Sequence, residues 1–246
     1  LFLIANLQKF KEGGFISLFL GLFLFWVMYT WQYAGKIKDG LLKFVNLHPH
    51  IPMLDALSND TDIPKYATHV VYLTNSTRPE KIEERIVESI YYKSPKRADL
   101  YWFVHINVTD EPYTMEYKTE TVEKDEVMSV TFNLGFRIVP RINMLFKTVL
   151  NDLYEKKEFN VSHSDRLFYR HNPAGEYRFI IFDTYLSQEN ELPLWKRIPM
   201  KLYFIIKMID LDTKRSFGLD HSLVTEEKVP LVVESAQNIR LKRITE

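Results

Sequence analysis

Four basic residues have the types and spacing that could bind an anionic ligand; they are Lys96, Arg97, Arg137 and Arg141. Arg137 and Arg141 bracket Pro140, and proline is typical of the first turn of a helix. The N-terminus of a helix attracts anions because its first N–H groups lack partners within the helix. These cations could therefore hold a phosphate group. The alternative is that they reach lipid headgroups or pair with nearby carboxylates, namely Asp99, Asp110 and Glu111.

The predicted strands indicate where such a ligand would bind. An open α/β sheet binds ligands beyond the carboxyl ends of its strands. In this chain those ends fall at residues 74–75, 107–113 and 135–137. This edge of the sheet is therefore a candidate site for a phosphate-bearing nucleotide, beside the alternative of internal pairing or lipid contact. The five candidate binding residues are Thr74, Asn75, Asn107, Arg137 and Arg141.

Other potentially reactive residues have ordinary structural interpretations. His48 and His50 lie one residue apart in a proline-rich segment, which favours solvated side chains over a metal pair. His69 and His105 each lie in an apolar strand, where a hydrogen-bonded core or sheet-end histidine is the usual role. The adjacent acids at 110–111 suit a loop better than a catalytic cleft. We predict no catalytic residue, no metal site and no cofactor.

Composition narrows the classes of protein that remain. The 246 residues include no cysteine, which excludes disulfides, thiolate zinc sites and a cysteine nucleophile. The 32 Lys and Arg balance 32 Asp and Glu, so net charge does not indicate a nucleic-acid partner. The sequence contains no glycine-rich dinucleotide fingerprint, no P-loop and no serine-hydrolase elbow.

The first 35 residues are much more apolar than the rest of the chain. No charged residue occurs between Glu12 and Lys36. This predicts a transmembrane helix at about 15–34, preceded by the end of an earlier membrane helix at 1–8. Three lysines follow the span and two precede it, which favours a cytoplasmic C-terminal part. A signal peptide or a buried core helix would be the alternatives, and three N-x-S/T triplets would suit an extracellular domain; they begin at Asn75, Asn107 and Asn160.

The rest of the chain alternates between strand and helix patterns. We expect a linker at 36–63 and a domain at 64–246. The predicted strands are 68–74, 99–108, 114–121, 127–136, 178–182, 229–233 and 239–244, with a hairpin joining the third and fourth. The predicted helices are 79–92, opened by a capping box of Thr77 and Glu80, one beginning at Pro140, and 192–209, split by Pro199. This order predicts a three-layer α/β domain with a mostly parallel sheet.

Several motifs resemble the KUP/HAK/KT potassium-uptake transporters. Residues 4–14 and 27–31 resemble the last two membrane helices of that family. The cytosolic motifs that carry the resemblance are 63–69, 95–99, 110–117, 134–137, 140–143 and 217–220. The resemblance covers nearly the whole chain.

The resemblance implies proton-coupled import of K+ by a multi-pass protein of the cell membrane, with H+ as the coupling ion. The family's potassium site lies in earlier helices, so no residue of this chain can be matched to it. The cytosolic domain of the family is similar to universal stress protein-like folds. Some bacterial members are inhibited by cyclic di-AMP, and related transporters form homodimers through this domain. The resemblance therefore implies that the cytosolic domain regulates and dimerises the transporter, and that the membrane helices contact the lipid bilayer.

Two other functions remain open from the residues alone. The domain could be a structural dimerisation module that binds no small ligand, because aromatic clusters such as 101–103 suit a core or an interface as well as a pocket. It could instead be a membrane-anchored enzyme acting on a nucleotide, which would need a base and an electrophile in one cleft.

Overall fold

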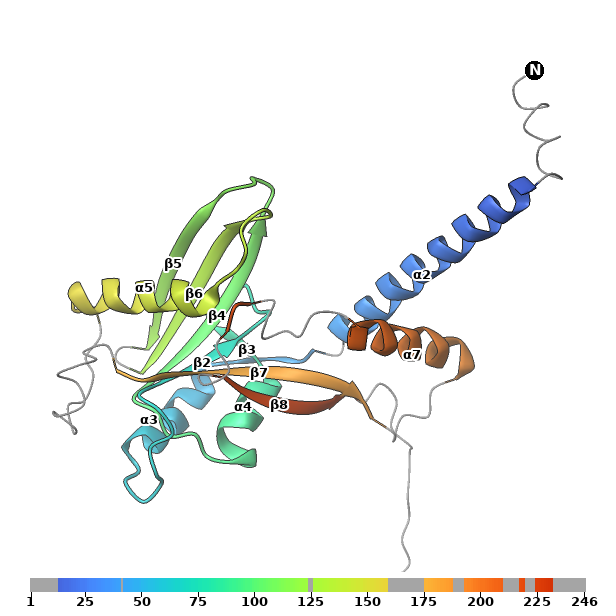
Figure 1. Cartoon of the computed structure of the whole chain (residues 1–246). Coiled ribbons are helices and arrows are strands. Elements are labelled where there is room, and N and C mark those ends of the chain that lie inside the picture. The colour runs from blue at the N-terminus through green and yellow to red at the C-terminus, as the bar shows by residue number, and fades with distance from the viewer. Residues whose placement is uncertain are drawn as a thin grey trace, which may run out of the picture. The chain divides into compact units, whose positions relative to one another are not determined.

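The computed structural model describes residues 13–40, 42–123, 126–158, 175–187, 193–209, 217–219 and 224–231. The chain divides into two compact units. One contains the helices α2 (Phe15–Gly40) and α7 (Leu194–Ile209), and the other contains a six-stranded sheet with its covering helices (Figure 1). The sequence assigns residues 192–209 to the α/β domain, whereas the structure groups this helix with α2.

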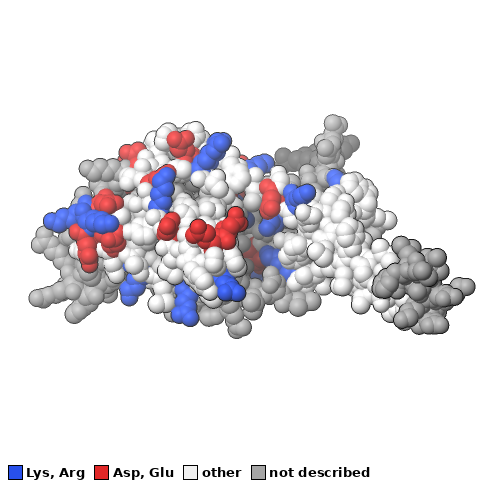
Figure 2. All heavy atoms as spheres, turned by 90° about the horizontal axis from the view of Figure 1, so that it is seen from above, with Lys and Arg blue, Asp and Glu red and all other residues white. Residues whose placement is uncertain are grey.

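Helix α2 is 26 residues long and apolar enough to cross a membrane. Most of its side chains are exposed, and only Thr30 and Ala34 are buried. The side of the molecule seen in Figure 2 shows α2 as a mostly uncharged surface, while the α/β unit carries interspersed acidic and basic side chains. The predicted span is thus a helix, and it continues past residue 34 to Gly40. The predicted partial helix at 1–8 lies outside the described residues.

Helix α7 is continuous through Pro199, which the sequence analysis wrongly expected to split it. Proline removes one helical hydrogen bond, but its fixed φ is compatible with a helix. Packing against α2 favours the unbroken helix, because it places Met200 and Tyr203 on the side of Ala34. The rings of Tyr203 and Trp31 lie 4.7 Å apart. Tertiary contacts therefore outweigh the local effect of proline.

The sheet has the strand order β5-β6-β4-β2-β7-β8. Its strands are β2 (His69–Leu73), β4 (Leu100–Thr109), β5 (Met115–Glu123), β6 (Val127–Gly135), β7 (Tyr177–Leu186) and β8 (Val224–Leu231). Strands β4 and β7 both run parallel to the central strand β2, and β6 runs parallel to β4. Strand β5 pairs antiparallel with β6, which confirms the predicted hairpin.

Each face of the sheet buries its own apolar core. One core joins Val71 and Trp102 to the buried side of α5 (Ile142–Glu155). The other joins side chains from the opposite face of the same strands to two further helices, α3 (Ile51–Asn59) and α4 (Glu84–Glu88). Strand segments covered on both faces form nearly continuous apolar runs, as β2 and the first half of β4 (100–104) show. The predicted three-layer arrangement with a mostly parallel sheet is confirmed.

The predicted helix at 79–92 begins later than expected. Residues Lys81–Glu83 form β3, which pairs antiparallel with β1 (Phe44–Asn46). Helical structure starts with α4 at Glu84 and continues as a π-helical turn at Ser89–Lys93. The expected capping box is wrong, because the N-cap position is occupied by Glu83 in an extended conformation, with no side-chain cap. A partner strand far away in sequence thus overrides the local helix signal.

The segment predicted as a linker contains part of the second core. Leu47, Leu54 and Leu57 are buried there, the last two from α3. Pro52 lies in the first turn of α3, a position where proline is tolerated because the N–H would have no helical partner. At the other end of the domain, β8 begins at Val224, earlier than the predicted 229–233, and residues 239–244 lie outside the described part.

The Glu126 carboxyl group at the start of β6 is expected to make the stability of the domain depend on pH. Burial, followed by the nearby Asp55 carboxylate, raises the pKa of Glu126 from 4.5 to about 7, and Glu123 acts in the same direction. A raised folded-state pKa contributes stability that is complete below about 4.5 and is lost as the pH rises through about 7. We expect the Tm to fall as the pH rises from about 4.5 to about 7, where the folded state binds the proton and the unfolded state does not, and to level off above that range. Thermal scans of Glu126→Gln should show a flatter profile.

The matched control for this measurement is Glu116→Gln, which changes an exposed carboxylate on β5. It should keep the pH dependence of the unchanged chain. An equally steep profile in Glu126→Gln would show that Glu126 is not the responsible group.

Candidate functional site

The strand order of the sheet reverses beside β2. From β2 the chain moves to β4 and then to β6 on one side, whereas β7 pairs with the other side of β2. Helix α4 follows β2 on one face of the sheet, and α5 follows β6 on the other face. In open α/β sheets a ligand site is expected at such a point of reversal, beyond the carboxyl ends of the two strands. Here those are the ends of β2 and β7.

A tight turn follows β2 at this position. The Thr74 N–H donates to the Val104 carbonyl at 2.9 Å, which extends the pairing with β4. The Thr74 hydroxyl accepts the N–H of Ser76 at 3.0 Å, and the Ser76 hydroxyl donates to the Arg78 carbonyl at 3.0 Å. Thr74 and Ser76 are buried, while Asn75 between them is exposed. The turn thus uses its hydroxyl groups internally and presents the Asn75 side chain at the surface.

The buried carboxylate of Glu83 holds this turn in place. Its Oε1 accepts the backbone N–H of Asn75 at 2.7 Å and the side-chain amide of Asn75 at 3.1 Å. Its Oε2 forms an ion pair with Nε of Arg85. Glu83 is fully buried because β3 pairs with β1. The carboxylate therefore links the turn after β2 to the start of α4.

Arg85 connects this cluster to β7. Its guanidinium carbon lies 4.7 Å from the centre of the Phe182 ring, a cation–π contact. Phe182 belongs to the carboxyl half of β7, two residues beyond the paired positions Tyr72 and Ile180. We call Asn75, Glu83, Arg85 and Phe182 the switch-point cluster.

The charge balance of the switch-point cluster limits what it can bind. Glu83 neutralises Arg85, so a phosphate would have to compete with a buried carboxylate for the guanidinium group. The Asn75 side-chain amide already donates to Glu83, so the exposed side chain has its carbonyl oxygen left to accept a hydrogen bond from a neutral polar ligand, such as a base or a sugar. The geometry thus suits recognition by hydrogen bonding better than attraction of an anion.

The structure does not bring the five predicted ligand residues together. Thr74 and Asn75 lie at the reversal point, but β4 and β6 extend well past the end of β2. Pairing of β2 with β4 ends at Leu73 and Val104, whereas pairing of β4 with β6 continues to Thr109 and Gly135. These five further residues of β4 correspond to about 16 Å of strand. The sequence-based prediction requires the carboxyl ends of these strands to lie at the same level of the sheet. The register shows that they do not.

Asn107 lies on this extended part of β4, and Arg137 lies in the turn just after the end of β6. The Asn107 amide donates to the Asn133 side chain at 2.9 Å, and Arg137 donates to the Tyr113 hydroxyl at 3.1 Å. Both side chains are exposed. The loop before β5 packs tightly here, since a Cβ atom on Gly135 would lie 2.4 Å from the backbone carbon of Pro112. The loop 110–113 has the structural role that the sequence predicts for it.

Arg141 occupies the N-cap of α5 without a side-chain capping bond. The N–H of Ile142 already donates to the Phe217 carbonyl at 2.9 Å. Gly218, with φ of +57°, lies close enough that a Cβ atom there would be 3.1 Å from the Arg141 Cα. The segments around Arg141 and Gly218, which belong to two of the motifs noted in the sequence, therefore contact each other. One N–H group at the start of α5 that could attract an anion, that of Ile142, already has a partner within the protein.

The other two predicted cations have protein partners. Lys96 is buried, and its ammonium group lies 2.7 Å from the Glu227 carboxylate and 2.6 Å from the Ser89 carbonyl. Arg97 donates to two backbone carbonyls, those of Ser58 at 3.0 Å and Ile63 at 3.1 Å. The sequence analysis rightly weighed internal pairing as an alternative, but it missed these partners.

The histidines in the strands have the structural roles expected of them. His69 is fully buried, and its Nδ1 accepts the indole N–H of Trp102 at 3.1 Å. His105 places Nδ1 3.2 Å from the Thr74 carbonyl oxygen. His48 and His50 form a short 3-10 turn. Across the described ranges, no group of three or more His, Asp and Glu side chains is placed to hold a metal ion.

The sequence analysis missed three members of the switch-point cluster: Glu83, Arg85 and Phe182. Glu83 and Arg85 fall inside the segment predicted as an amphipathic helix, where charged residues are read as solvated. Glu83 is buried at the end of β3, which pairs with β1, and nothing local in the sequence signals that pairing.

Comparisons with known proteins identify the family. Residues 67–234 match the family described as K+ potassium transporter C-terminal domain. The chain is 42% identical over 243 residues to the probable potassium transport system protein Kup of Cytophaga hutchinsonii, covering 99% of this chain and 37% of that protein. It is 41% identical over 244 residues to the Kup protein of Flavobacterium johnsoniae (99% and 37%) and 37% identical over 243 residues to that of Clostridium perfringens (99% and 36%).

No solved structure matches the chain. The chain spans about 37% of the length of the first relatives that it matches. The family match covers most of both cores of the α/β unit, and the relatives extend the similarity over α2 and over the core residues that precede residue 67. The chain belongs to the KUP/HAK/KT family of potassium transporters.

Proposed function

We propose that this chain is the C-terminal part of a proton-coupled potassium-uptake transporter of the cell membrane. In this proposal α2 is a transmembrane span of a multi-pass protein, and the α/β unit lies in the cytoplasm. The observation that carries it is an exposed apolar helix of span length on the N-terminal side of a domain of this family. The proposed division of the chain remains a membrane end at 1–35, a connection at 36–63 and a cytosolic domain at 64–246.

The exposure of α2 supports its placement in lipid. Phe19, Phe25 and Met28 are each about two thirds exposed or more, which is unfavourable for a helix in water. In a bilayer the same side chains face hydrocarbon, and the helix satisfies its own backbone groups. Lys36 and Lys38 follow the apolar part, which supports a cytoplasmic exit. We assign K+ and H+ binding to parts of the transporter outside this chain, because the apolar part of α2 carries no carboxylate.

We propose that the α/β unit is a non-catalytic, universal stress protein-like domain that regulates and dimerises the transporter. Support for a nucleotide such as cyclic di-AMP comes from the point of strand reversal, where Thr74 and Asn75 lie. Asn107 on β4, Arg137 after the end of β6 and Arg141 at the N-cap of α5 remain candidates for a second contact region. The alternative is a structural module that binds no small ligand. It is supported by the switch-point cluster, in which Glu83 already neutralises Arg85.

A chimera tests this proposal. The chain would replace the matching C-terminal part of the Cytophaga hutchinsonii relative in cells that lack potassium uptake. We expect rubidium uptake to be restored, and to be lost when residues 64–246 are deleted. In vesicles loaded with cyclic di-AMP, we expect inhibition that Asn75→Ala weakens and that the exposed control Asn151→Ala leaves unchanged. Absence of uptake would contradict the transporter assignment. Uptake without any nucleotide effect would leave the structural module as the function of the domain.

A further inference from the structure

Helix α7 has an unusual charge composition for a surface helix. Its sixteen residues include four cations and no Asp or Glu. The cations are Lys196, Arg197, Lys201 and Lys207. Trp195 lies in the first turn, with Nζ of Lys196 5.1 Å from its ring centre. This combination of basic residues and tryptophan is typical of helices that lie in the headgroup layer of a membrane.

The side chains of α7 that face away from α2 form an apolar stripe. Leu194, Ile198 and Ile205 are 72%, 53% and 56% exposed, and their spacing of four and seven residues places them on the same face of the helix. Arg197 and Lys201 are also exposed, one turn apart along the flank of that stripe. Apolar side chains flanked by cations are complementary to an anionic lipid surface, in which a layer of phosphate groups covers the hydrocarbon.

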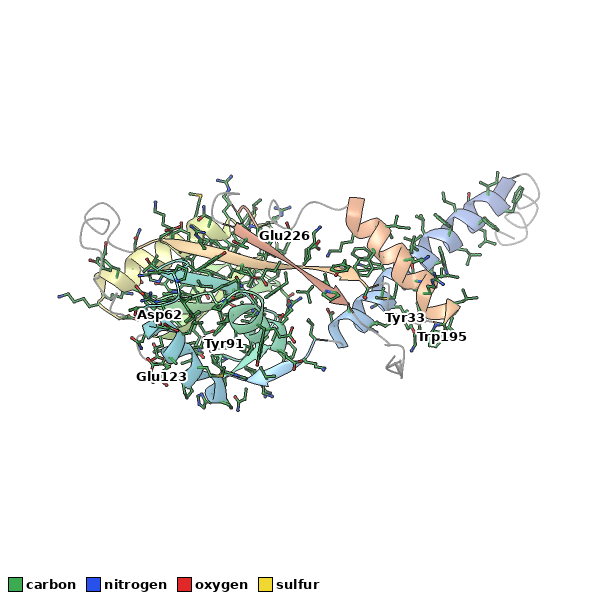
Figure 3. All side chains as sticks on the ribbon, turned by 90° about the horizontal axis from the view of Figure 1, so that it is seen from below. Tyr33, Asp62, Tyr91, Glu123, Trp195 and Glu226 are labelled. Carbon is green, nitrogen blue, oxygen red and sulfur yellow. The ribbon has the colours of Figure 1, made fainter. Side chains whose placement is uncertain are left out.

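The opposite face of α7 packs on the end of α2 that precedes Gly40. Tyr203 contacts Trp31, and Met200 and Tyr203 are buried with Ala34. Figure 3 labels Tyr33 of α2 and Trp195 in the first turn of α7. An apolar groove of about 530 Å³ lies at this junction, lined by α2 residues between Phe25 and Gln32 and by one side chain of α7, Ile206.

We propose that α7 lies in the headgroup layer of the membrane and binds anionic phospholipids through Arg197 and Lys201, with Leu194, Ile198 and Ile205 inserted below them. The inference rests on the proposed function, in which α2 crosses the bilayer. Packing on Trp31 and Ala34 then holds α7 at the level where the aromatic end of α2 leaves the hydrocarbon. The groove at the junction is open to an acyl chain of the bound lipid.

The chain has no cysteine, so single labelled cysteines can report the depth of each helix. The whole chain would be reconstituted into vesicles of phosphatidylcholine alone or mixed with phosphatidylglycerol. Spin labels would be attached to Ile198→Cys on α7, Phe19→Cys on α2 and Val108→Cys on the α/β unit. Relaxation by oxygen, compared with a water-soluble nickel chelate, gives the depth. We expect the label at 198 to lie in lipid in the anionic vesicles and to be more exposed to nickel in phosphatidylcholine.

Removing the two cations should release the helix from the anionic surface. In the Ile198→Cys background, Arg197→Gln with Lys201→Gln should lower the ratio of lipid-seated to detached α7 by about 30-fold, roughly fivefold for each cation. The matched control, Lys81→Gln with Lys147→Gln, removes two exposed cations from the α/β unit and should leave the ratio unchanged.

The outcomes separate this inference from the proposed function. A lipid-facing label at Phe19 with a nickel-accessible label at 198 in both vesicles would overturn the inference and keep the membrane span. A nickel-accessible label at Phe19 would overturn the span itself. The label at 198 could instead be shielded from both oxygen and the nickel chelate, with its spectrum broadened by the same label on a neighbouring chain. That result would show that another copy of the chain covers this face, which also contradicts lipid binding. If the label at 198 lay at the same depth in both kinds of vesicle, binding of α7 would not require anionic lipid, which would contradict the inference.

Discussion

Replacing Glu83 with methionine is expected to lower the free energy of unfolding by about 3–5 kcal/mol, the usual effect of removing one partner of a buried ion pair. The Glu83 side chain is 1% exposed and that of Arg85 is 17% exposed. Methionine would leave the guanidinium group with no carboxylate and remove the acceptor of both Asn75 donors. Denaturant unfolding of the chain in detergent, followed by tryptophan fluorescence, measures the change.

Two controls separate the buried pair from a general effect of losing charge. The double variant Glu83→Met with Arg85→Met should recover much of the loss, because no unpaired charge is left in the core. Glu120→Met breaks the surface pair with Lys118 and should change stability by only about 0–1 kcal/mol. If Glu83→Met matched Glu120→Met, Glu83 would not be holding the turn after β2.

Replacing Lys96 with methionine is expected to have a similarly large effect, again about 3–5 kcal/mol. The side chains of Lys96 and Glu227 are only 3% and 11% exposed, and their charged atoms lie 2.7 Å apart. The Ser89 hydroxyl donates to the same Glu227 oxygen at 2.9 Å and lies 3.0 Å from the Tyr72 hydroxyl. Burial, the largest cause, raises the pKa of Tyr72 well above its usual value, so this phenol remains protonated. The network attaches β8 to the rest of the sheet.

A double-mutant cycle checks this second prediction. Glu227→Gln alone and Lys96→Met alone should each destabilise the chain, and the double variant should lose much less than the sum of the two. Unfolding in denaturant gives each free energy. Strictly additive losses would show that Lys96 and Glu227 do not depend on each other.

Several elements could be predicted because their signals are local. The uncharged run between Glu12 and Lys36 predicts α2, since length and apolarity are properties of the segment alone. The alternating residues of β5 and β6 predict their hairpin, which closes over a short connection. The helical spacing of apolar residues after Pro140 predicts α5 with its buried side.

The candidate site could be predicted only in part. The rule that ligands bind beyond the carboxyl ends of parallel strands selected Thr74 and Asn75, and the structure places both residues where the strand order reverses. The same rule wrongly grouped Arg137 with them, because hydrophobic runs do not reveal that β4 and β6 extend past β2. Register depends on which strands pair, and that depends on the whole sheet.

The amino-acid order alone was sufficient for the family, the apolar span and the layered α/β class, since each depends on motifs or patterns within short segments. Tertiary structure decided the rest: that Glu83 is buried against Arg85, that Lys96 pairs with Glu227, and that α7 stays whole while packing on α2. Burial of a charge and tolerance of a proline are set by partners remote in sequence, and the free energy of those contacts exceeds the local preference that a short segment expresses.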